Sequence, residues 1–245
     1  MIALLSDIHA NIEALNACLA HARAQGATRY MFLGDFVGYG ADPQAVVDLV
    51  AQHVSQGAIA VKGNHDAALE NRAGRMKDSA QDAIDWTIGV LSEGGKAFLA
   101  SLPLCAREGD ICLVHASAMH PEKWNYVEDK AAAYESIRAS GATYTFGGHV
   151  HEQVLYSRSS VGKLIDFRPI AGSAVPVASH RSWLAIVGAV GQQRDGNPAA
   201  CYALFDPGHQ AITFYRVPYD TDAAARKVRA AGLPESLALQ IEQGS

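Results

Sequence analysis

The sequence predicts an α/β protein in which two β-sheets pack face to face. In the first part of the 245 residues, three apolar segments each lead through a polar loop into a helix-like segment, and this alternation favours a mainly parallel sheet with right-handed crossovers. After residue 152, five apolar segments follow one another as in a meander, which is typical of an antiparallel sheet. No linker separates the two patterns. We therefore expect both sheets within one domain that spans residues 1–245.

The first part of the chain opens with three strand–helix units. Asn11 is a good N-cap for the first helix, whose apolar stripe begins at Ile12 and ends near Gly26. Asp42 and Pro43 mark the start of the second helix. The expected strands of these units are residues 2–5, 30–33 and 58–61.

The remaining elements follow from the same periodicities. Residues 78–101 read as two helices with a break at Gly94 and Gly95. A strand at 111–114, a helix at 129–140 and a strand at 143–146 complete the first part. The later expected strands are residues 153–157, 163–167, 183–187, 201–206 and 211–217. Two closing helices, at 220–231 and 235–242, form a C-terminal helical extension over residues 220–245.

Charge and cysteine usage exclude several classes of protein. The formal net charge is −5 and the chain has no run of Lys or Arg, which argues against an extended nucleic-acid surface or a membrane-surface protein. The four cysteines are scattered and form no CxxC pair, so we expect buried free thiols in a reducing compartment. The first strand begins at residue 2 and no apolar run is long enough to span a bilayer. These features predict a cytoplasmic protein and leave the oligomeric state open.

Polar side chains that can bind metals follow each strand of the first part. Because sites in such sheets lie beyond the carboxyl ends of the strands, these residues fall where chemistry is expected. His149 and His151 are two residues apart after the strand 143–146, and on an extended chain both would face the same volume. The full set is Asp7, His9, Asp35, Asn64, His65, His115, His149 and His151.

This set of carboxylates, imidazoles and one amide oxygen is too large for a single tetrahedral site. It suits two divalent ions about 3.5–4 Å apart, bridged by Asp35, which is the standard device for displacement at phosphorus by an activated hydroxide. Two ions contribute +4, Asp7 and Asp35 −2 and the hydroxide −1, so the remaining +1 favours an anionic phosphate. His65 is the candidate to protonate or stabilise the leaving oxygen, and Asp66 could orient its ring.

Five sequence blocks occur in an order that resembles the calcineurin-like metallophosphoesterase superfamily, over roughly residues 1–217. The resemblance is greatest to its small bacterial members, the YfcE-like and diadenosine-tetraphosphatase-like phosphoesterases. It implies a four-layer αββα sandwich with two mixed sheets inside and helices outside. The blocks are Asp7-x-His9, Gly34-Asp35 with Gly40, Gly63-Asn64-His65-Asp66, His115, and Gly148-His149-x-His151.

The resemblance also implies a role for each residue. Asp7, His9, Asp35 and His151 would hold the first metal, and Asp35, Asn64, His115 and His149 the second. Family members use manganese most readily, with iron, nickel or zinc as alternatives. The implied activity is hydrolysis of a phosphodiester, a nucleotide or a small phosphomonoester, with His65 and Asp66 as catalytic residues.

The chain departs from the family pattern in places. Asp66 stands where Glu is frequent, and Ala10 and Ala116 stand where glycine is usual. A signature of the bacterial branch near residues 188–198 has Ala189 in place of its serine. The turn 36–40 lacks the arginine of the protein-phosphatase branch, which argues against a phosphoprotein substrate.

Four further residues are predicted to contact the substrate. Arg194 could bind a phosphate through its planar guanidinium or form a structural salt bridge, and Asn197 belongs to the same signature. Trp124 and Tyr126 could stack on a nucleobase or pack on their own domain. The loops 66–78 and 116–128, together with the second sheet, would set the identity of the substrate. Lys62 and Arg72 flank the third block and are weaker candidates for substrate contacts.

The alternative to an enzyme is a non-catalytic protein-interaction scaffold on the same fold, since such descendants exist in this superfamily. A scaffold can lose the leaving-group histidine or metal ligands, whereas this chain keeps His65 and the whole ligand set. A metal-free hydrolase would need a nucleophile–base pair, and the chain has no nucleophile-elbow motif. The sequence therefore favours a metal-dependent phosphoesterase.

Overall fold

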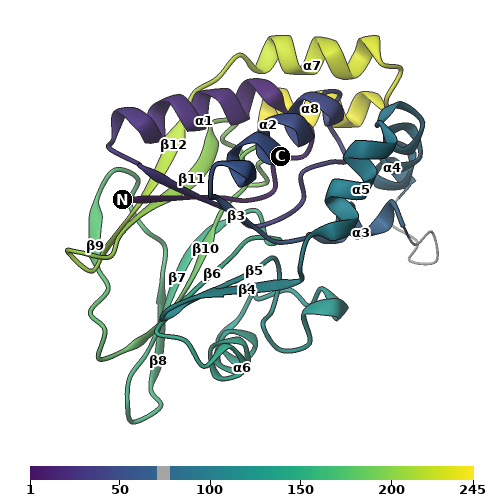
Figure 1. The fold of residues 1–245 in the computed structure, drawn as a ribbon. Coiled ribbons are helices and arrows are strands. Elements are labelled where there is room, and N and C mark those ends of the chain that lie inside the picture. The colour runs from purple at the N-terminus through teal and green to yellow at the C-terminus, as the bar shows by residue number, and fades with distance from the viewer. Residues whose placement is uncertain (71–77) are drawn as a thin grey trace.

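The structure is a computed structural model that describes residues 1–70 and 78–245. It has the expected four layers, with two six-stranded sheets inside and helices outside (Figure 1). Helices α1 (Ile12–Ala24) and α2 (Pro43–Ser55) cover the outer face of one sheet. Helix α6 (Lys130–Ser140) covers the outer face of the other. The predicted fold class is confirmed.

The first sheet has the strand order β3-β2-β1-β11-β12-β9. Strands β1, β2 and β3 are parallel. On the other side of β1, each of the strands β11, β12 and β9 runs antiparallel to the strand before it in the sheet. The bounds are β1 Ile2–Leu5, β2 Arg29–Phe32, β3 Ile59–Ala60, β9 Ala174–Pro176, β11 Ala200–Asp206 and β12 Ala211–Val217.

The second sheet has the order β4-β5-β6-β10-β7-β8. Strands β5, β6 and β10 are parallel, and the outer pairs are antiparallel. The bounds are β4 Cys105–Glu108, β5 Ile111–Val114, β6 Tyr144–Gly147, β7 Gln153–Arg158, β8 Leu164–Phe167 and β10 Ser182–Val187.

The predicted division of strands between the sheets is wrong, because each sheet combines strands from both parts of the chain. Strand β11 pairs with β1, and β10 lies between β6 and β7. Both β1 and β6 are buried along their whole length. Sheets divided at residue 152 would leave such strands as edges with unpaired backbone groups, and pairing with β11 and β10 removes those edges.

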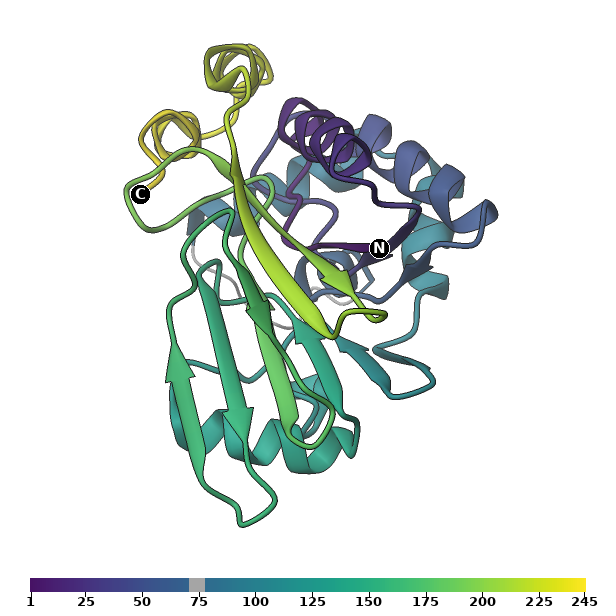
Figure 2. The same cartoon turned by 90° about the vertical axis from the view of Figure 1, so that its left-hand side faces the viewer.

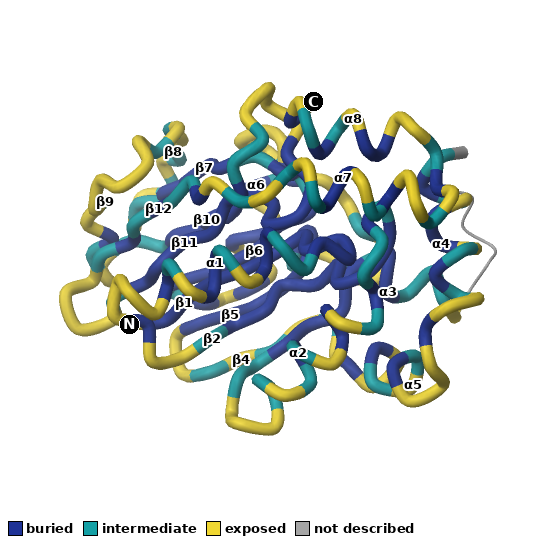
Figure 3. The backbone as a smooth tube through the Cα atoms, turned by 90° about the horizontal axis from the view of Figure 1, so that it is seen from above, coloured by how far each residue is buried: buried dark blue, intermediate teal, exposed yellow. Residues whose placement is uncertain are grey.

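Alternation along β1 divides its side chains between two cores. Ile2 and Leu4 pack in the cluster between the sheets, while Ala3 and Leu5 pack in the cluster beneath α1 and α2, as the two-residue period of a strand requires. Seen from above, the buried parts of the tube concentrate along the central strands and the exposed parts on the surrounding turns (Figure 3). The rigid core therefore supports the loops at the strand ends.

Four further helical segments lie in the first part: α3 Asn64–Ala68, α4 Asp78–Val90, α5 Glu93–Ser101 and the 3₁₀ helix η1 Pro121–Lys123. The break between α4 and α5 precedes Gly94 and Gly95 rather than falling on them. Its cause is Ser92, whose hydroxyl accepts a 3.1 Å hydrogen bond from Gly95 N and caps α5. The predicted cap of α1 is confirmed, because Asn11 Oδ1 accepts a 3.0 Å bond from Ala14 N.

Helices α7 (Thr221–Ala230) and α8 (Glu235–Gln243) lie side by side (Figure 2), with α7 next to α1. They share an apolar cluster with Ala83 of α4. Lys227 of α7 forms ion pairs of 2.5 Å with Glu13 and 2.8 Å with Asp42. The Asp42 side chain therefore anchors α7 and accepts no capping hydrogen bond from α2. No helix within residues 1–70 and 78–245 is long and apolar enough to cross a bilayer.

Candidate metal centre

Loops from both sheets meet at one edge of the sandwich. Asp7 and Asp35 follow β1 and β2 of the first sheet, and His115 and His149 follow β5 and β6 of the second. The backbone N–H of His149 donates to both oxygens of Asp7, at 3.0 and 3.2 Å. This bond ties the loop after β6 to the loop after β1 across the two sheets.

The ligand loops adopt an unusual backbone conformation. Five predicted ligands have positive φ angles: Asp7 (53°), His9 (49°), Asp35 (56°), His149 (68°) and His151 (65°). A non-glycine residue in this region costs of order 1–3 kcal/mol and persists where the surroundings enforce it. The prediction that His149 and His151 converge because they extend a strand is therefore wrong, since β6 ends at Gly147 and left-handed turns aim both rings.

The first group of ligands comprises Asp7, His9 and His151, all buried. His151 Nε2 lies 3.3 Å from Asp7 Oδ1 and 3.3 Å from His9 Nε2. His9 Nε2 also lies 3.8 Å from Asp35 Oδ2. These are the four residues predicted for the first metal.

The second group is built around His115, whose Nε2 lies 3.3 Å from Asp35 Oδ2. The same nitrogen is 3.1 Å from Asn64 Oδ1 and 3.2 Å from His149 Nδ1. Asp35 Oδ2 thus lies within 4 Å of a ring nitrogen from each group, at 3.8 Å from His9 and 3.3 Å from His115. His65 forms a third possible group with His9 and Asp35, so its ring also reaches this volume.

Backbone carbonyls fix the tautomers of three ligand rings. The Nδ1 atoms of His9, His115 and His151 lie 3.1, 2.7 and 2.6 Å from the carbonyl oxygens of Val37, Leu33 and Gln192. A neutral ring that donates from Nδ1 presents a lone pair at Nε2. The Nε2 atoms of His9 and His151 therefore face each other as two acceptors at 3.3 Å. This arrangement fits a shared cation, and the carbonyls supply the outer hydrogen bonds typical of metal-binding histidines.

Electrostatics at the centre also suit a cation. Burial alone would raise the pKa of Asp7, but His151 and His115 outweigh burial and hold that pKa well below its ordinary value. Burial likewise opposes the ionisation of Asp35, whereas His115 and His65 lower its pKa. Within the described residues, no ion pair joins either carboxylate to Lys or Arg. Two buried carboxylates whose only charged neighbours are imidazoles are well suited to compensation by divalent ions.

The imidazoles respond to the same charges. Burial would lower the pKa of His115, yet Asp35 and Asp7 raise it to about 9. Burial and the neighbouring His115 lower the pKa of His149 to about 4. The buried Nε2 of His149 has no hydrogen-bond partner among the described residues. The donor set therefore consists of ionised carboxylates and imidazoles near one volume, which is chemistry suited to borderline divalent metals.

Comparison with known proteins agrees with this geometry. A family model described as "Calcineurin-like phosphoesterase" matches residues 1–153. The chain belongs to the calcineurin-like phosphoesterase family. The protein is accordingly a metal-dependent phosphoric ester hydrolase with clustered His and Asp ligands.

Three proteins are similar to this phosphoesterase over its whole length. The uncharacterized protein MJ0912 of Methanocaldococcus jannaschii is 33% identical, with 100% of this chain and 98% of the relative covered. The crystal structure of a metallophosphoesterase from Sphaerobacter thermophilus is similar with a TM-score of 0.87 at 36% identity, covering 100% and 98% of the two chains. The hypothetical protein PH1004 of Pyrococcus horikoshii OT3 shares the fold, with a TM-score of 0.79 at 17% identity over 100% and 99%.

Asp66 is buried in the phosphoesterase site but makes different contacts from those predicted. Its carboxylate accepts 2.9 Å hydrogen bonds from the backbone N–H groups of Asp35, Phe36 and Gly63. Burial and the nearby Asp35 raise the pKa of Asp66 to about 7. The expected hydrogen bond to the His65 ring is absent from the described structure, because both oxygens are turned toward these backbone donors. Asp66 holds the loop that presents Asp35.

His65 is positioned by packing rather than by a carboxylate. Its ring lies 4.8 Å from the His9 ring and 4.6 Å from the Tyr39 ring, measured between centroids. Its buried Nδ1 has no hydrogen-bond partner among the described residues, and a Cβ at Gly38 would come within 2.4 Å of it. Burial lowers the pKa of His65 to about 4. The ring is therefore neutral near pH 7.

The predicted substrate contacts divide into two groups. Arg194 and Tyr126 line a cavity of about 390 Å³ together with Asn64 and His65, and the Trp124 ring lies 6.1 Å from that of His115. Asn197 lines none of the described cavities beside the site, because its side-chain oxygen accepts a 3.0 Å bond from Ala199 N. Lys62 bonds to Glu70 at 2.7 Å and to Ala100 O at 2.9 Å. Arg72 lies outside the described residues.

Three residues of this region were not predicted from sequence. Tyr39, Gln192 and Gln240 line the cavity that contains His65. Tyr39 could have been noticed as an aromatic residue at the centre of a Gly-rich turn, where it has a φ of 63°. Gln192 and Gln240 carry no sequence signal, since their position depends on how α8 folds back over the site.

Proposed function

We propose that this phosphoesterase holds two divalent ions, manganese in first place, and hydrolyses a phosphodiester, a nucleotide or a small phosphomonoester. The proposal rests on the position of Asp35 between the two groups of candidate ligands. Its Oδ2 lies 3.8 Å from His9 Nε2 and 3.3 Å from His115 Nε2, so one carboxylate oxygen belongs to two groups of ligands.

The two ligand sets follow from these groups. Asp7, His9, Asp35 and His151 would hold one ion, and Asp35, Asn64, His115 and His149 the other. When bound, such ions supply Lewis acidity for the phosphoryl oxygens and lower the pKa of a water nucleophile. Iron, nickel and zinc suit the same mixture of imidazole and carboxylate ligands.

His65 would act at the leaving oxygen. Because its pKa is lowered to about 4, the neutral ring can donate one N–H hydrogen bond but holds no additional proton near pH 7. His65 would therefore stabilise the leaving oxygen by donating a hydrogen bond rather than by transferring a proton to it. Packing between His9 and Tyr39 keeps the ring in place.

Arg194 would bind a non-reacting phosphoryl oxygen. The structural salt bridge considered as the alternative is not formed within the described residues. Arg194 Nη2 instead lies 3.3 Å from Gln192 Oε1 and 3.5 Å from the Tyr39 hydroxyl, while Asp195 pairs with Arg216. An exposed guanidinium held only by neutral groups retains its charge and donors for an anion.

The test measures hydrolysis of bis-p-nitrophenyl phosphate and p-nitrophenyl phosphate, with and without manganese, together with the number of metal ions bound per chain. We expect manganese-dependent turnover, two ions per chain in the wild type, and loss of turnover in Asp35→Asn. Glu93→Gln changes an exposed surface carboxylate and serves as the control. Two bound ions without hydrolysis of either ester would favour the scaffold alternative, and a single ion would contradict the two-metal proposal.

A further inference from the structure

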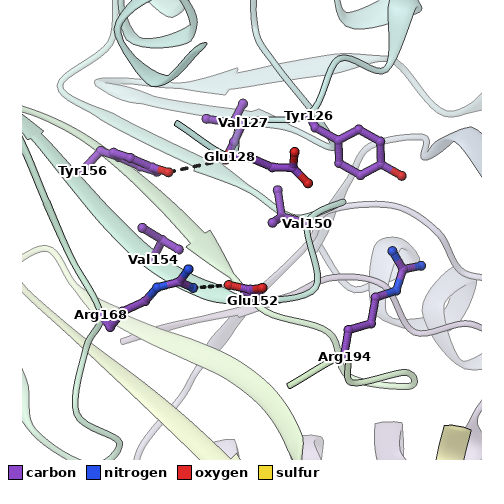
Figure 4. A pocket seen from close by; sticks show the side chains of 9 residues that line it. All are labelled: Tyr126, Val127, Glu128, Val150, Glu152, Val154, Tyr156, Arg168 and Arg194. Carbon is purple, nitrogen blue, oxygen red and sulfur yellow. Dashed lines mark hydrogen bonds and ion pairs between the residues drawn. The ribbon is translucent and has the colours of Figure 1, made fainter. Parts of the chain in front are cut away.

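A second, larger cavity lies directly beside the metal centre. It has a volume of about 640 Å³, within the range of pockets that enclose a drug-sized ligand. In Figure 4, Tyr126 and Arg194 lie at one end of this cavity and Tyr156 and Arg168 at the other, with Glu128 and Val150 between them. None of these six residues is a predicted metal ligand.

The two cavities share their boundary residues. Tyr126 and Arg194 line both the large cavity and the smaller one that contains Asn64 and His65. The Tyr126 ring stacks on the ring of His149, with centroids 4.0 Å apart and planes inclined by 21°. A phosphate group at the metal centre would therefore have one substituent directed past Tyr126 and Arg194 into the large cavity.

The charges of the cavity disfavour a second phosphate. Arg168, at the far end, is paired with Glu152, so its charge is already compensated. Glu128 is exposed and forms no ion pair within the described residues. An anionic group placed beyond Arg194 would meet this uncompensated carboxylate, whereas hydroxyl groups could donate hydrogen bonds to it.

Apolar side chains form another part of the wall. Val127 and Val154 are buried, and Val150 lies between the two ligand histidines. The Tyr156 hydroxyl is directed to the Val127 carbonyl oxygen at 3.5 Å and the residue is almost fully buried, so the half-buried Val150 offers the accessible apolar surface. The cavity thus combines an apolar face with one carboxylate, Glu128, that is unpaired in the described part of the chain.

We infer that the large cavity is a subsite for a neutral, hydroxylated substituent of a phosphodiester, bound through a vicinal diol by Glu128 and packed on Val150. The diester specificity rests on the proposed function, whereas binding of the neutral arm does not. A nucleoside and a glycoside both offer a diol next to a less polar face. The volume of about 640 Å³ accommodates either.

The first experiment measures binding without hydrolysis. Adenosine and methyl β-glucoside are titrated separately into the manganese-loaded protein by calorimetry, for the wild type, Glu128→Gln and the control Glu93→Gln. Because hydrogen bonds to a charged group are stronger than those to a neutral amide, we expect the Kd of the ligand to rise about tenfold in Glu128→Gln and to stay constant in Glu93→Gln. Preference for adenosine identifies a nucleoside arm, and preference for the glucoside identifies a glycoside arm.

The second experiment compares hydrolysis of uridine 5′-p-nitrophenyl phosphate, whose ribose carries a vicinal diol, with that of p-nitrophenyl phosphate. We expect Glu128→Gln to lower the ratio of their kcat/KM values about tenfold. Failure to hydrolyse either ester, with Glu128-dependent binding intact, would overturn the proposed function but keep the subsite. Absence of binding by both neutral ligands, or equal Kd values in the wild type and Glu128→Gln, would overturn the subsite itself.

Discussion

Gln240 in α8 accepts a 2.9 Å hydrogen bond from the side-chain amide of Gln192. The backbone carbonyl of Gln192 lies 2.6 Å from His151 Nδ1, and its side-chain oxygen accepts a 3.3 Å bond from Arg194. One residue of the last helix therefore supports the segment that orients a predicted metal ligand and a predicted phosphate contact.

Removing this support should weaken both functions of the segment. We expect Gln240→Ala to lower manganese affinity about tenfold, the scale found for outer hydrogen-bond partners of metal ligands, and to raise the KM for p-nitrophenyl phosphate through Arg194. Competition with a chelator and steady-state kinetics measure the two effects. Gln243→Ala on the exposed side of the same helix is the control. Equal behaviour of both variants would show that the Gln240 bond has no role at the site.

The three backbone bonds of Asp66 lead to a prediction about stability. Its Oδ2 accepts from Asp35 N and Gly63 N, and its Oδ1 accepts from Phe36 N. In Asp66→Asn an amide nitrogen would place a donor against a backbone donor. We expect the free energy of unfolding of metal-free protein to fall by about 1–3 kcal/mol in urea titrations.

The control for Asp66 is Asp48→Asn on the exposed face of α2, where the carboxylate accepts from Gln44 at 2.7 Å. A surface change of this kind should alter stability by less than about 0.5 kcal/mol. If Asp66→Asn unfolds at the same urea concentration as the wild type, the three backbone bonds do not stabilise the Asp35 loop, and another role for Asp66 must be sought.

Sequence order predicted which residues gather at the candidate metal centre, because each follows an apolar strand. Asp7, Asp35 and His115 follow the ends of β1, β2 and β5 within three residues, and where strands run parallel such positions lie at one edge of a sheet. The prediction therefore did not require the correct sheet order. It also did not require the left-handed turn at His149, which only the surrounding structure imposes.

Sheet membership could not be predicted in the same way. β10 pairs with β6 and β7, and β11 pairs with β1 from almost the opposite end of the chain. These pairings satisfy backbone groups that are distant in sequence, and no local pattern marks them. The contacts of Asp66 were mispredicted for a related reason. Its carboxylate accepts hydrogen bonds from the backbone N–H groups of Asp35 and Phe36, which lie about thirty residues earlier in the chain.

The hairpin of β4 and β5 contains a titratable thiol that departs from the expected buried cysteines. Cys105 is exposed, and its Sγ lies 3.4 Å from the buried Sγ of Cys112. A hydrogen bond from Cys112 lowers the pKa of Cys105 to about 7. Since the thiolate is the nucleophile, we expect its alkylation by iodoacetamide to rise with pH with a midpoint near 7.

Mass spectrometry can follow this alkylation at each cysteine. Cys112→Ala removes the donor and should move the midpoint for Cys105 up toward its ordinary value of 9.0. Cys18 and Cys201 are buried, and burial raises the pKa of both thiols, so they should stay unmodified in folded protein. A wild-type midpoint near 9 would show that the Cys105–Cys112 hydrogen bond does not stabilise the thiolate.

Gly38 offers a test of how His65 is held. Its φ is 85°, and a Cβ there would lie 2.4 Å from His65 Nδ1, whereas Gly57 has a φ of 99° with no atom within 4 Å of an added Cβ. Both Gly38→Ala and Gly57→Ala should lower the free energy of unfolding by about 1–2 kcal/mol, because alanine is strained at positive φ. Only Gly38→Ala should also displace the imidazole and reduce turnover.

The leaving group distinguishes displacement of His65 from a general defect in the site. A hydrogen bond to the leaving oxygen matters more for a poor leaving group, so Gly38→Ala and His65→Ala should lower kcat for phenyl phosphate more than for p-nitrophenyl phosphate. Gly57→Ala should leave the ratio of the two rates unchanged. If Gly38→Ala lowers both rates by the same factor while His65→Ala does not, the glycine shapes the metal centre and does not position the imidazole for the departing oxygen.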